Sequence, residues 1–83
     1  MKMKIKSWKV SQIIHDMSKF GDKYDINIEG QTFGVDFEKC VDAEGYCTVT
    51  NVYNVLKSTD KALYVNIDGF KTWIPKSASV LLG

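Results

Sequence analysis

Alternating apolar and polar residues flank Asp68-Gly69, which is the strongest short turn signal in the chain. This dipeptide between two alternating runs predicts a β-hairpin with a two-residue turn, which fixes the residues that face each other. One face then holds the pairs Ile67 with Phe70, Val65 with Thr72, and Leu63 with Ile74. The other face holds Asn66 with Lys71, Tyr64 with Trp73, and Ala62 with Pro75. Since Pro75 has no amide hydrogen to donate, it ends the ladder or lies at a sheet edge.

A second hairpin is predicted over residues 24–37, with Gly30-Gln31 as its turn. Its register sorts every apolar residue to one face, as in a half-buried antiparallel pair: Tyr24, Ile26, Ile28, Phe33, Val35 and Phe37. The other face is polar: Asp25, Asn27, Glu29, Thr32, Gly34 and Asp36. Asp25 then lies opposite Asp36, a like-charge pair that destabilises a sheet. A cation site, an acidic surface for a basic partner and a solvated face are the three interpretations, and a solvated face is the simplest.

Residues 7–21 have the spacing of an amphipathic helix. The apolar positions that recur on one face are Val10, Ile13, Ile14, Met17 and Phe20. Ser7 suits the N-cap, and Gly21 suits the left-handed exit of the helix.

The remaining segments are less strongly patterned. Three lysines alternate with apolar residues over 1–6, which indicates a short edge strand or a frayed terminus. Residues 39–47 are expected to form a loop. Residues 48–58 fit a helix by the spacing of Val49, Val52 and Leu56, but their Val, Thr and Tyr content favours the strand that we predict.

These elements predict one α+β domain spanning residues 1–83. We expect an N-terminal amphipathic helix packed on a curled, mainly antiparallel sheet of about five strands, forming a small half-open barrel. The expected core residues are Ile13, Ile14, Met17, Ile26, Ile28, Phe33, Val35, Phe37, Leu63, Val65, Ile67 and Ile74.

Charge is unevenly distributed, although the formal net charge is only +1. Residues 1–20 carry five lysines against one aspartate, whereas residues 21–44 carry seven acidic residues against two lysines. All 11 basic residues are lysines. Without the guanidinium fork that most often reads base edges, sequence-specific nucleic-acid recognition is disfavoured.

Few reactive side chains are available. One histidine and two cysteines cannot complete a four-ligand zinc site, and nothing in the spacing suggests a Cys–His nucleophile pair. The glycines stand singly at turns rather than in a phosphate-binding loop. We therefore expect a non-catalytic protein with no metal and no cofactor. Cys40 and Cys47 are expected to be reduced thiols, with a disulfide as the alternative if their segments pair as a hairpin.

No apolar run has the length of an export signal or a membrane span. This composition predicts a soluble, cytoplasmic protein with no membrane contact.

The run from Thr59 to Ser77, TDKALYVNIDGFKTWIPKS, covers about a quarter of the chain. It resembles the C-terminal segment of small uncharacterised phage-encoded proteins, in which a T-x-K-A strand leads through a turn to W-I-P-K-S. The resemblance implies a strand-rich fold, which supports a strand over 48–58, and a phage or mobile-element origin. It also implies the kind of short inhibitor that phages encode, including anti-CRISPR-like proteins acting in the host cell.

Two candidate contact surfaces follow. The first is the Tyr64–Trp73 pair, which is either covered by the helix as part of the core or exposed as a flat platform with Lys71 and Lys76 at its rim. The second is the acidic stretch 22–44, of which Asp25, Glu29, Asp36 and Glu38 are expected to carry binding.

The favoured function is a binding protein that inhibits or modulates a host or phage protein complex through the acidic surface. The first alternative is an accessory protein that binds single-stranded nucleic acid through the aromatic platform. The second is a homo-oligomeric structural protein that pairs through edge strands.

Overall fold

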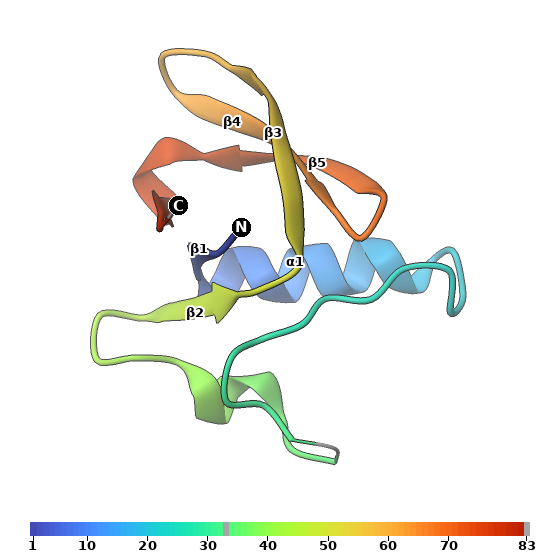
Figure 1. The fold of residues 1–83 in the computed structure, drawn as a ribbon. Helices are drawn as coiled ribbons and strands as arrows, with labels where there is room; N and C mark the ends of the chain where they lie inside the picture. Colours follow the sequence, from blue (N-terminus) through green and yellow to red (C-terminus); the bar gives the residue numbers. More distant parts are fainter. Residues whose placement is uncertain (33, 83) are drawn as a thin grey trace.

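The computed structural model describes residues 1–32 and 34–82 (Figure 1). In chain order its elements are β1 (Met3–Lys6), α1 (Ser7–Ser18), the 3₁₀ helix η1 (Phe37–Cys40), β2 (Tyr46–Val49), β3 (Val52–Ser58), β4 (Ala62–Ile67), β5 (Phe70–Pro75), the 3₁₀ helix η2 (Lys76–Ala78) and β6 (Ser79–Leu81). The predicted α+β class with one N-terminal helix is confirmed.

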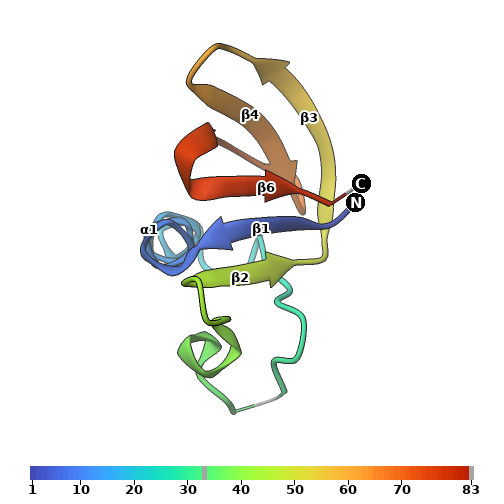
Figure 2. The same cartoon turned by 90° about the vertical axis from the view of Figure 1, so that its left-hand side faces the viewer.

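The strands form two three-stranded antiparallel sheets, ordered β2-β1-β6 and β3-β4-β5, rather than one sheet of about five strands. Only two residues separate β2 from β3, so the chain passes directly from one sheet to the other (Figure 2). The two ends of the chain lie side by side, and the Leu82 amide donates to the Lys2 carbonyl at 3.1 Å.

The β4–β5 hairpin has the predicted register at every pair from Ile67–Phe70 to Ala62–Pro75. Asp68 (φ 55°) and Gly69 (φ 93°) both adopt left-handed conformations, which a two-residue hairpin turn requires. Pro75 is the last residue of β5, and β5 lies at the edge of its sheet, where a missing donor costs no ladder bond.

The predicted hairpin over residues 24–37 is wrong. The segment before Gly30 instead lies against the β2–β3 junction. There the Glu29 amide donates to the Thr48 carbonyl at 2.8 Å, and the Thr50 amide donates to the Asn27 carbonyl at 2.9 Å. Ile28 forms an isolated bridge with the fully buried Val49. Because pairing with Val49 buries Ile28 in the core, this contact between distant segments forms in place of the local hairpin.

After Gly30 the Gln31 amide donates to the Ile28 carbonyl and the Val35 amide to the Thr32 carbonyl, and η1 follows. Among the described residues 31–32 and 34–37, none belongs to a returning strand. Asp25 therefore does not face Asp36 across a ladder. The predicted place of Phe33 opposite Ile28 and in the core lies outside the described residues.

β1 is the central strand of its sheet, not an edge strand or a frayed end. It pairs with β2 on one side and with β6, from the other end of the chain, on the other. Met3 and Ile5 are fully buried, and the alternating lysines point away from the core. The prediction failed because the partner that covers the second edge is more than 70 residues away in sequence.

Helix α1 ends three residues earlier than predicted, and Ser7 is its first residue rather than its N-cap. Lys6 holds the cap position without a side-chain bond, and the Ser7 amide donates to the Gly45 carbonyl at 2.9 Å instead. Gly21 has the predicted left-handed conformation. Phe20 lies beyond the helix and is 55% exposed, so it does not belong to the buried face.

One apolar cluster joins the helix and both sheets. Most expected core residues belong to it, and Ile14 and Phe37 pack at its margin. Val35 is half-buried and does not join the cluster. Val10, predicted on the apolar face of the helix, is also fully buried. The other core residues absent from the expected list are Met3, Ile5, Cys47, Val49, Val52 and Ala78.

The predicted strand within residues 48–58 is confirmed by β3 and by the end of β2. The expected loop over 39–47 contains the end of η1 and the start of β2 as well as a turn.

Candidate functional site

The outer face of the β3-β4-β5 sheet carries two rows of side chains that run across the three strands. Cα pairing places Lys57, Tyr64 and Trp73 in one row. The second row holds Asn54, Asn66 and Lys71. Residues paired across antiparallel strands point to the same face, so both lysines flank the aromatic pair.

Tyr64 and Trp73 contact each other on this face, with ring centroids 4.8 Å apart and ring planes inclined by 35°. Trp73 is 43% exposed, whereas Tyr64 is half-buried. The interpretation in which the helix covers the pair as part of the core is therefore wrong. Tyr64 supports one side of a tryptophan that remains open to solvent.

A groove of about 600 Å³ lies between α1 and the β4–β5 hairpin. The helical side contributes Lys9, Asp16, Lys19 and, just beyond the helix end, Phe20. The hairpin side contributes Tyr64, Phe70, Lys71, Thr72 and Trp73. We call this feature the α1–β5 groove.

Positive charge predominates in the α1–β5 groove. Of the described residues that line it, Asp16 alone is acidic, and Lys19 Nζ lies 3.8 Å from the Asp16 carboxylate. Lys9 donates to the Gln12 amide oxygen at 2.9 Å. Among the residues that the structure describes, Lys9 and Lys71 form no ion pair. Their charges are available to an anionic partner.

Phe20, Tyr24 and Phe70 close one end of the groove as a cluster of edge-on rings, with centroids 5.4 to 6.1 Å apart. At these separations the rings contact one another, so they leave no room for a cation between them. The cluster holds the end of the helical segment against the β4–β5 turn. It therefore positions the groove rather than forming a separate pocket.

The predicted contact residues separate into two groups. Lys71 and Trp73 line the groove with Tyr64, whereas Lys76 begins η2 and does not line it. Lys9, Lys19, Phe20 and Lys57 were not predicted. Lys57 could not be found by extending the hairpin register, because β3 pairs with β4 through two register shifts, one of them between Val55 and Lys57. The helical residues could not be found either, because the packing of α1 beside β5 has no local sequence signal.

The predicted acidic surface is dispersed. Glu29 pairs with Lys2 at 2.7 Å. Asp25 accepts a hydrogen bond from the Ile26 amide at 3.0 Å, and its own amide donates to Asp68. Asp36 and Glu38 are exposed at the start of η1, within the loop that projects from the sheets (Figure 1).

Asp68 fastens this loop to the β4–β5 turn. Its carboxylate accepts bonds from the Tyr53 hydroxyl and from the Asp25 amide, both at 2.8 Å. The Tyr53 hydrogen bond, followed by the Asp25 amide, holds the pKa of Asp68 below its usual value. The same bond raises the pKa of Tyr53.

Asp42 performs a similar function at the start of β2. Its carboxylate accepts bonds from the amides of Tyr46 and Glu44, and Lys4 Nζ lies 3.5 Å away. The Tyr46 amide makes the largest contribution to the lowered pKa of Asp42. This carboxylate organises the turn between η1 and β2.

Cys40 and Cys47 are both free thiols. Cys47 is buried in the core cluster, and burial is the main cause of the raised pKa of its thiol. Nearby Cys40 and Asp42 raise it further. A raised pKa leaves less of the nucleophilic thiolate at neutral pH.

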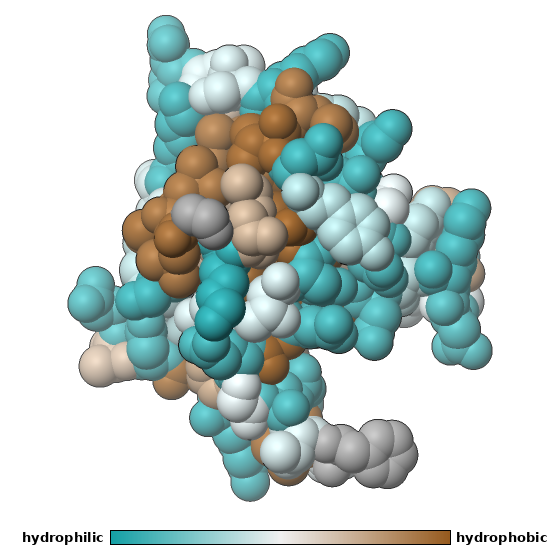
Figure 3. Space-filling view, viewed as in Figure 1, coloured by the Kyte–Doolittle hydropathy of each residue, from teal (hydrophilic) through white to brown (hydrophobic). Residues whose placement is uncertain are grey.

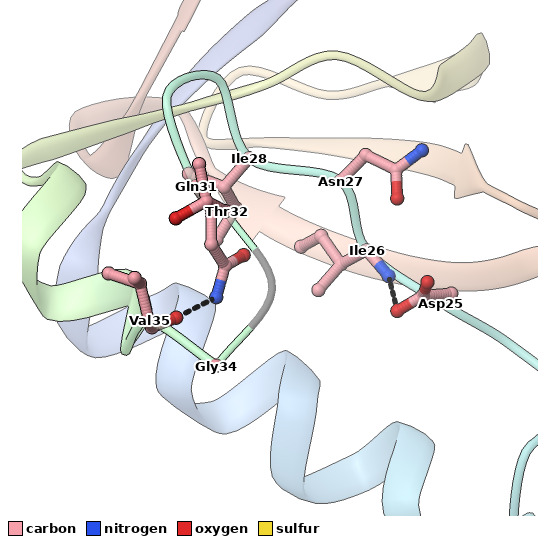
Figure 4. Close-up of a pocket in the computed structure, with 8 residues that line it drawn as sticks. All are labelled: Asp25, Ile26, Asn27, Ile28, Gln31, Thr32, Gly34 and Val35. Atoms are coloured by element: carbon pink, nitrogen blue, oxygen red, sulfur yellow. Dashed lines mark hydrogen bonds between the residues drawn. The ribbon is translucent and has the colours of Figure 1, made fainter.

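A second, open hollow of about 460 Å³ is lined by residues of the 25–35 loop (Figure 4). Two of its polar side chains form bonds within the loop: Gln31 donates to the Val35 carbonyl at 2.8 Å, and Asp25 accepts from the Ile26 amide at 3.0 Å.

Exposed apolar side chains gather on another face, around the C-terminal end and toward the β3–β4 hairpin (Figure 3). The exposed aliphatic residues in these parts of the chain are Met1, Leu56, Val80, Leu81 and Leu82.

Within residues 1–32 and 34–82, no group of three or more His, Cys, Asp or Glu side chains could hold a metal ion. In the same ranges, no helix has the length and apolar character needed to cross a membrane. No family model matches the chain, and neither a curated protein nor a solved structure matches it significantly.

Proposed function

We propose that the protein is a small non-catalytic binding protein that acts through the α1–β5 groove. Its short chain and its C-terminal W-I-P-K-S segment support a phage-type protein that inhibits or modulates a host or phage complex in the host cytoplasm, for example an anti-CRISPR-like inhibitor.

The observation that carries this proposal is the exposure of Trp73 beside Tyr64 at the groove. Exposed aromatic residues held on rigid strands are frequent centres of binding energy, since they offer a large contact area with little loss of conformational freedom. Unpaired Lys71 lies in the adjacent row of the sheet. The groove thus combines an anchor with a charged rim.

The proposal predicts that groove substitutions abolish partner recovery. Wild-type protein, Trp73→Ala and Lys71→Glu would be immobilised and exposed to a bacterial lysate treated with nuclease. Lys39→Ala is the matched control, because Lys39 is an exposed lysine on η1 outside the groove. We expect the control to retain every partner of the wild type, and both groove variants to lose at least one protein. Recovery of the same proteins by all four would contradict the proposal.

The acidic loop remains a second candidate contact surface. Asp36 and Glu38 are exposed and, in the described part of the chain, form no ion pair. A projecting acidic segment can occupy a basic nucleic-acid-binding groove on a target, with attraction that weakens as salt rises. Charge reversal by Asp36→Lys and Glu38→Lys would then remove the partner while Trp73→Ala retained it, the reverse of the pattern expected for the groove.

A further inference from the structure

We infer that the α1–β5 groove binds single-stranded nucleic acid, with bases stacked on Trp73 and phosphates held by the lysines around it. The inference rests on the proposed function, because it names the ligand of the same groove. The lysines concerned are Lys9, Lys19, Lys57 and Lys71.

The geometry of the aromatic pair supports the stacking of a base on Trp73. The ring centroids of Tyr64 and Trp73 lie 4.8 Å apart, and the ring planes are inclined by 35°. Tyr64 therefore holds the indole of Trp73 in place while part of the indole surface stays exposed. Both residues lie on paired strands, which makes the platform rigid before any ligand binds. Every base has a flat face, so such a platform accepts any base that is not already stacked in a duplex.

The positive charge of the α1–β5 groove supports the binding of phosphates. Lys9, Lys19 and Lys71 line the groove, and Lys57 on β3 is paired with Tyr64. Among the described residues that line the groove, Asp16 alone carries a carboxylate. Four acidic residues of the 22–44 stretch, Asp36, Glu38, Asp42 and Glu44, lie around η1 and the turn before β2, away from this sheet (Figure 1). A near-neutral molecule therefore presents a locally positive groove, which matches a phosphate backbone by charge complementarity.

The lysines around Trp73 favour nucleic acid over a protein as the ligand of the groove. Lysine is depleted in the buried centres of protein–protein interfaces, yet here lysines surround the aromatic anchor. Aromatic faces interleaved with cations are instead the usual arrangement in single-strand binding grooves. Lysine contacts phosphate as a point charge and carries little base preference, so we expect binding with weak sequence dependence.

Fluorescence anisotropy with a labelled oligonucleotide of about 12 nucleotides tests the inference. Three lysines without ion pairs, Lys9, Lys57 and Lys71, predict a slope of log affinity against log salt of about −2, or a loss of about 20-fold between about 50 mM and 200 mM salt. Trp73→Ala should weaken binding by roughly 10- to 100-fold. Lys71→Ala should reduce the slope by about 0.7, and Lys39→Ala should leave it unchanged.

Two further variants separate stacking from folding. Trp73→Phe keeps an aromatic face and should bind more tightly than Trp73→Ala, with circular dichroism confirming that both fold. Trp8→Phe leaves Trp73 as the sole tryptophan, and its fluorescence should be quenched when a base stacks on it.

Three outcomes would overturn the inference: no binding of wild-type protein at about 50 mM salt, equal affinity of duplex and single strand, or unchanged affinity in Trp73→Ala. Each is distinguishable from failure of the proposed function. If the oligonucleotide does not bind but Trp73→Ala still loses a protein partner from the nuclease-treated lysate, the groove is a binding site with a protein ligand.

Discussion

Asp68 lies in the β4–β5 turn, and its carboxylate connects this turn to β3 and to the loop that contains Asp25. It follows β4, takes a left-handed conformation, and accepts bonds from the Tyr53 hydroxyl and the Asp25 amide. Its side-chain role could not be predicted from the sequence, because the Asp-Gly signal indicates only the turn. The partners come from β3 and from a loop more than 40 residues away.

Acid should destabilise the protein through Asp68 and Asp42. Both have pKa values below the ordinary 3.8, so their folded-state bonds stabilise the protein above that pH and are lost as the pH falls through the lowered values. Chemical denaturation at a series of pH values should show stability falling below about pH 4. Tyr53→Phe removes the main cause of the Asp68 shift and should make this fall smaller. An unchanged pH dependence in that variant would contradict the assignment.

At the scale of single elements, the sequence predicted a structure correctly where its signals were local. The β4–β5 register follows from Asp68-Gly69 and from strict alternation, and both aromatic residues of the candidate site follow with it. The segment before Gly30 alternates equally well, but its apolar residues pack where Val49 offers a partner in the core. Alternation identifies a buried face without identifying the strand that will pair with it.

Strand β1 illustrates the same limit and carries a stability prediction. Its alternating lysines suggested an edge, yet partners on both sides make it central. Ile5→Ala should lower the free energy of unfolding by about 2–5 kcal/mol, because the lost side-chain atoms leave a cavity at a fully buried position. Lys4→Ala, on the opposite face of the strand, should cost less than about 1 kcal/mol. Similar losses for the two variants in urea denaturation would contradict the burial of Ile5 in the core.

At the scale of the whole molecule, the groove depends on how α1 packs beside β5. The hydrophobic pattern of α1 indicates which residues are buried, but it does not indicate along which strand the helix lies. For this reason Tyr64, Lys71 and Trp73 were found from sequence, whereas Lys9 and Lys19 were not. A site formed by two elements requires the packed fold.

The two sheets should unfold together, because one apolar cluster contains residues of both sheets and of α1. The two tryptophans provide a direct test, since Trp8 lies on α1, which follows β1, and Trp73 lies on β5 of the other sheet. In Trp73→Phe, the fluorescence of Trp8 reports the first region. In Trp8→Phe, the fluorescence of Trp73 reports the second. We expect each fluorescence transition in urea to coincide with that variant's own circular dichroism transition. A separate, earlier transition of Trp73 would mean that the β3-β4-β5 sheet, and the binding groove with it, opens independently of the rest of the core.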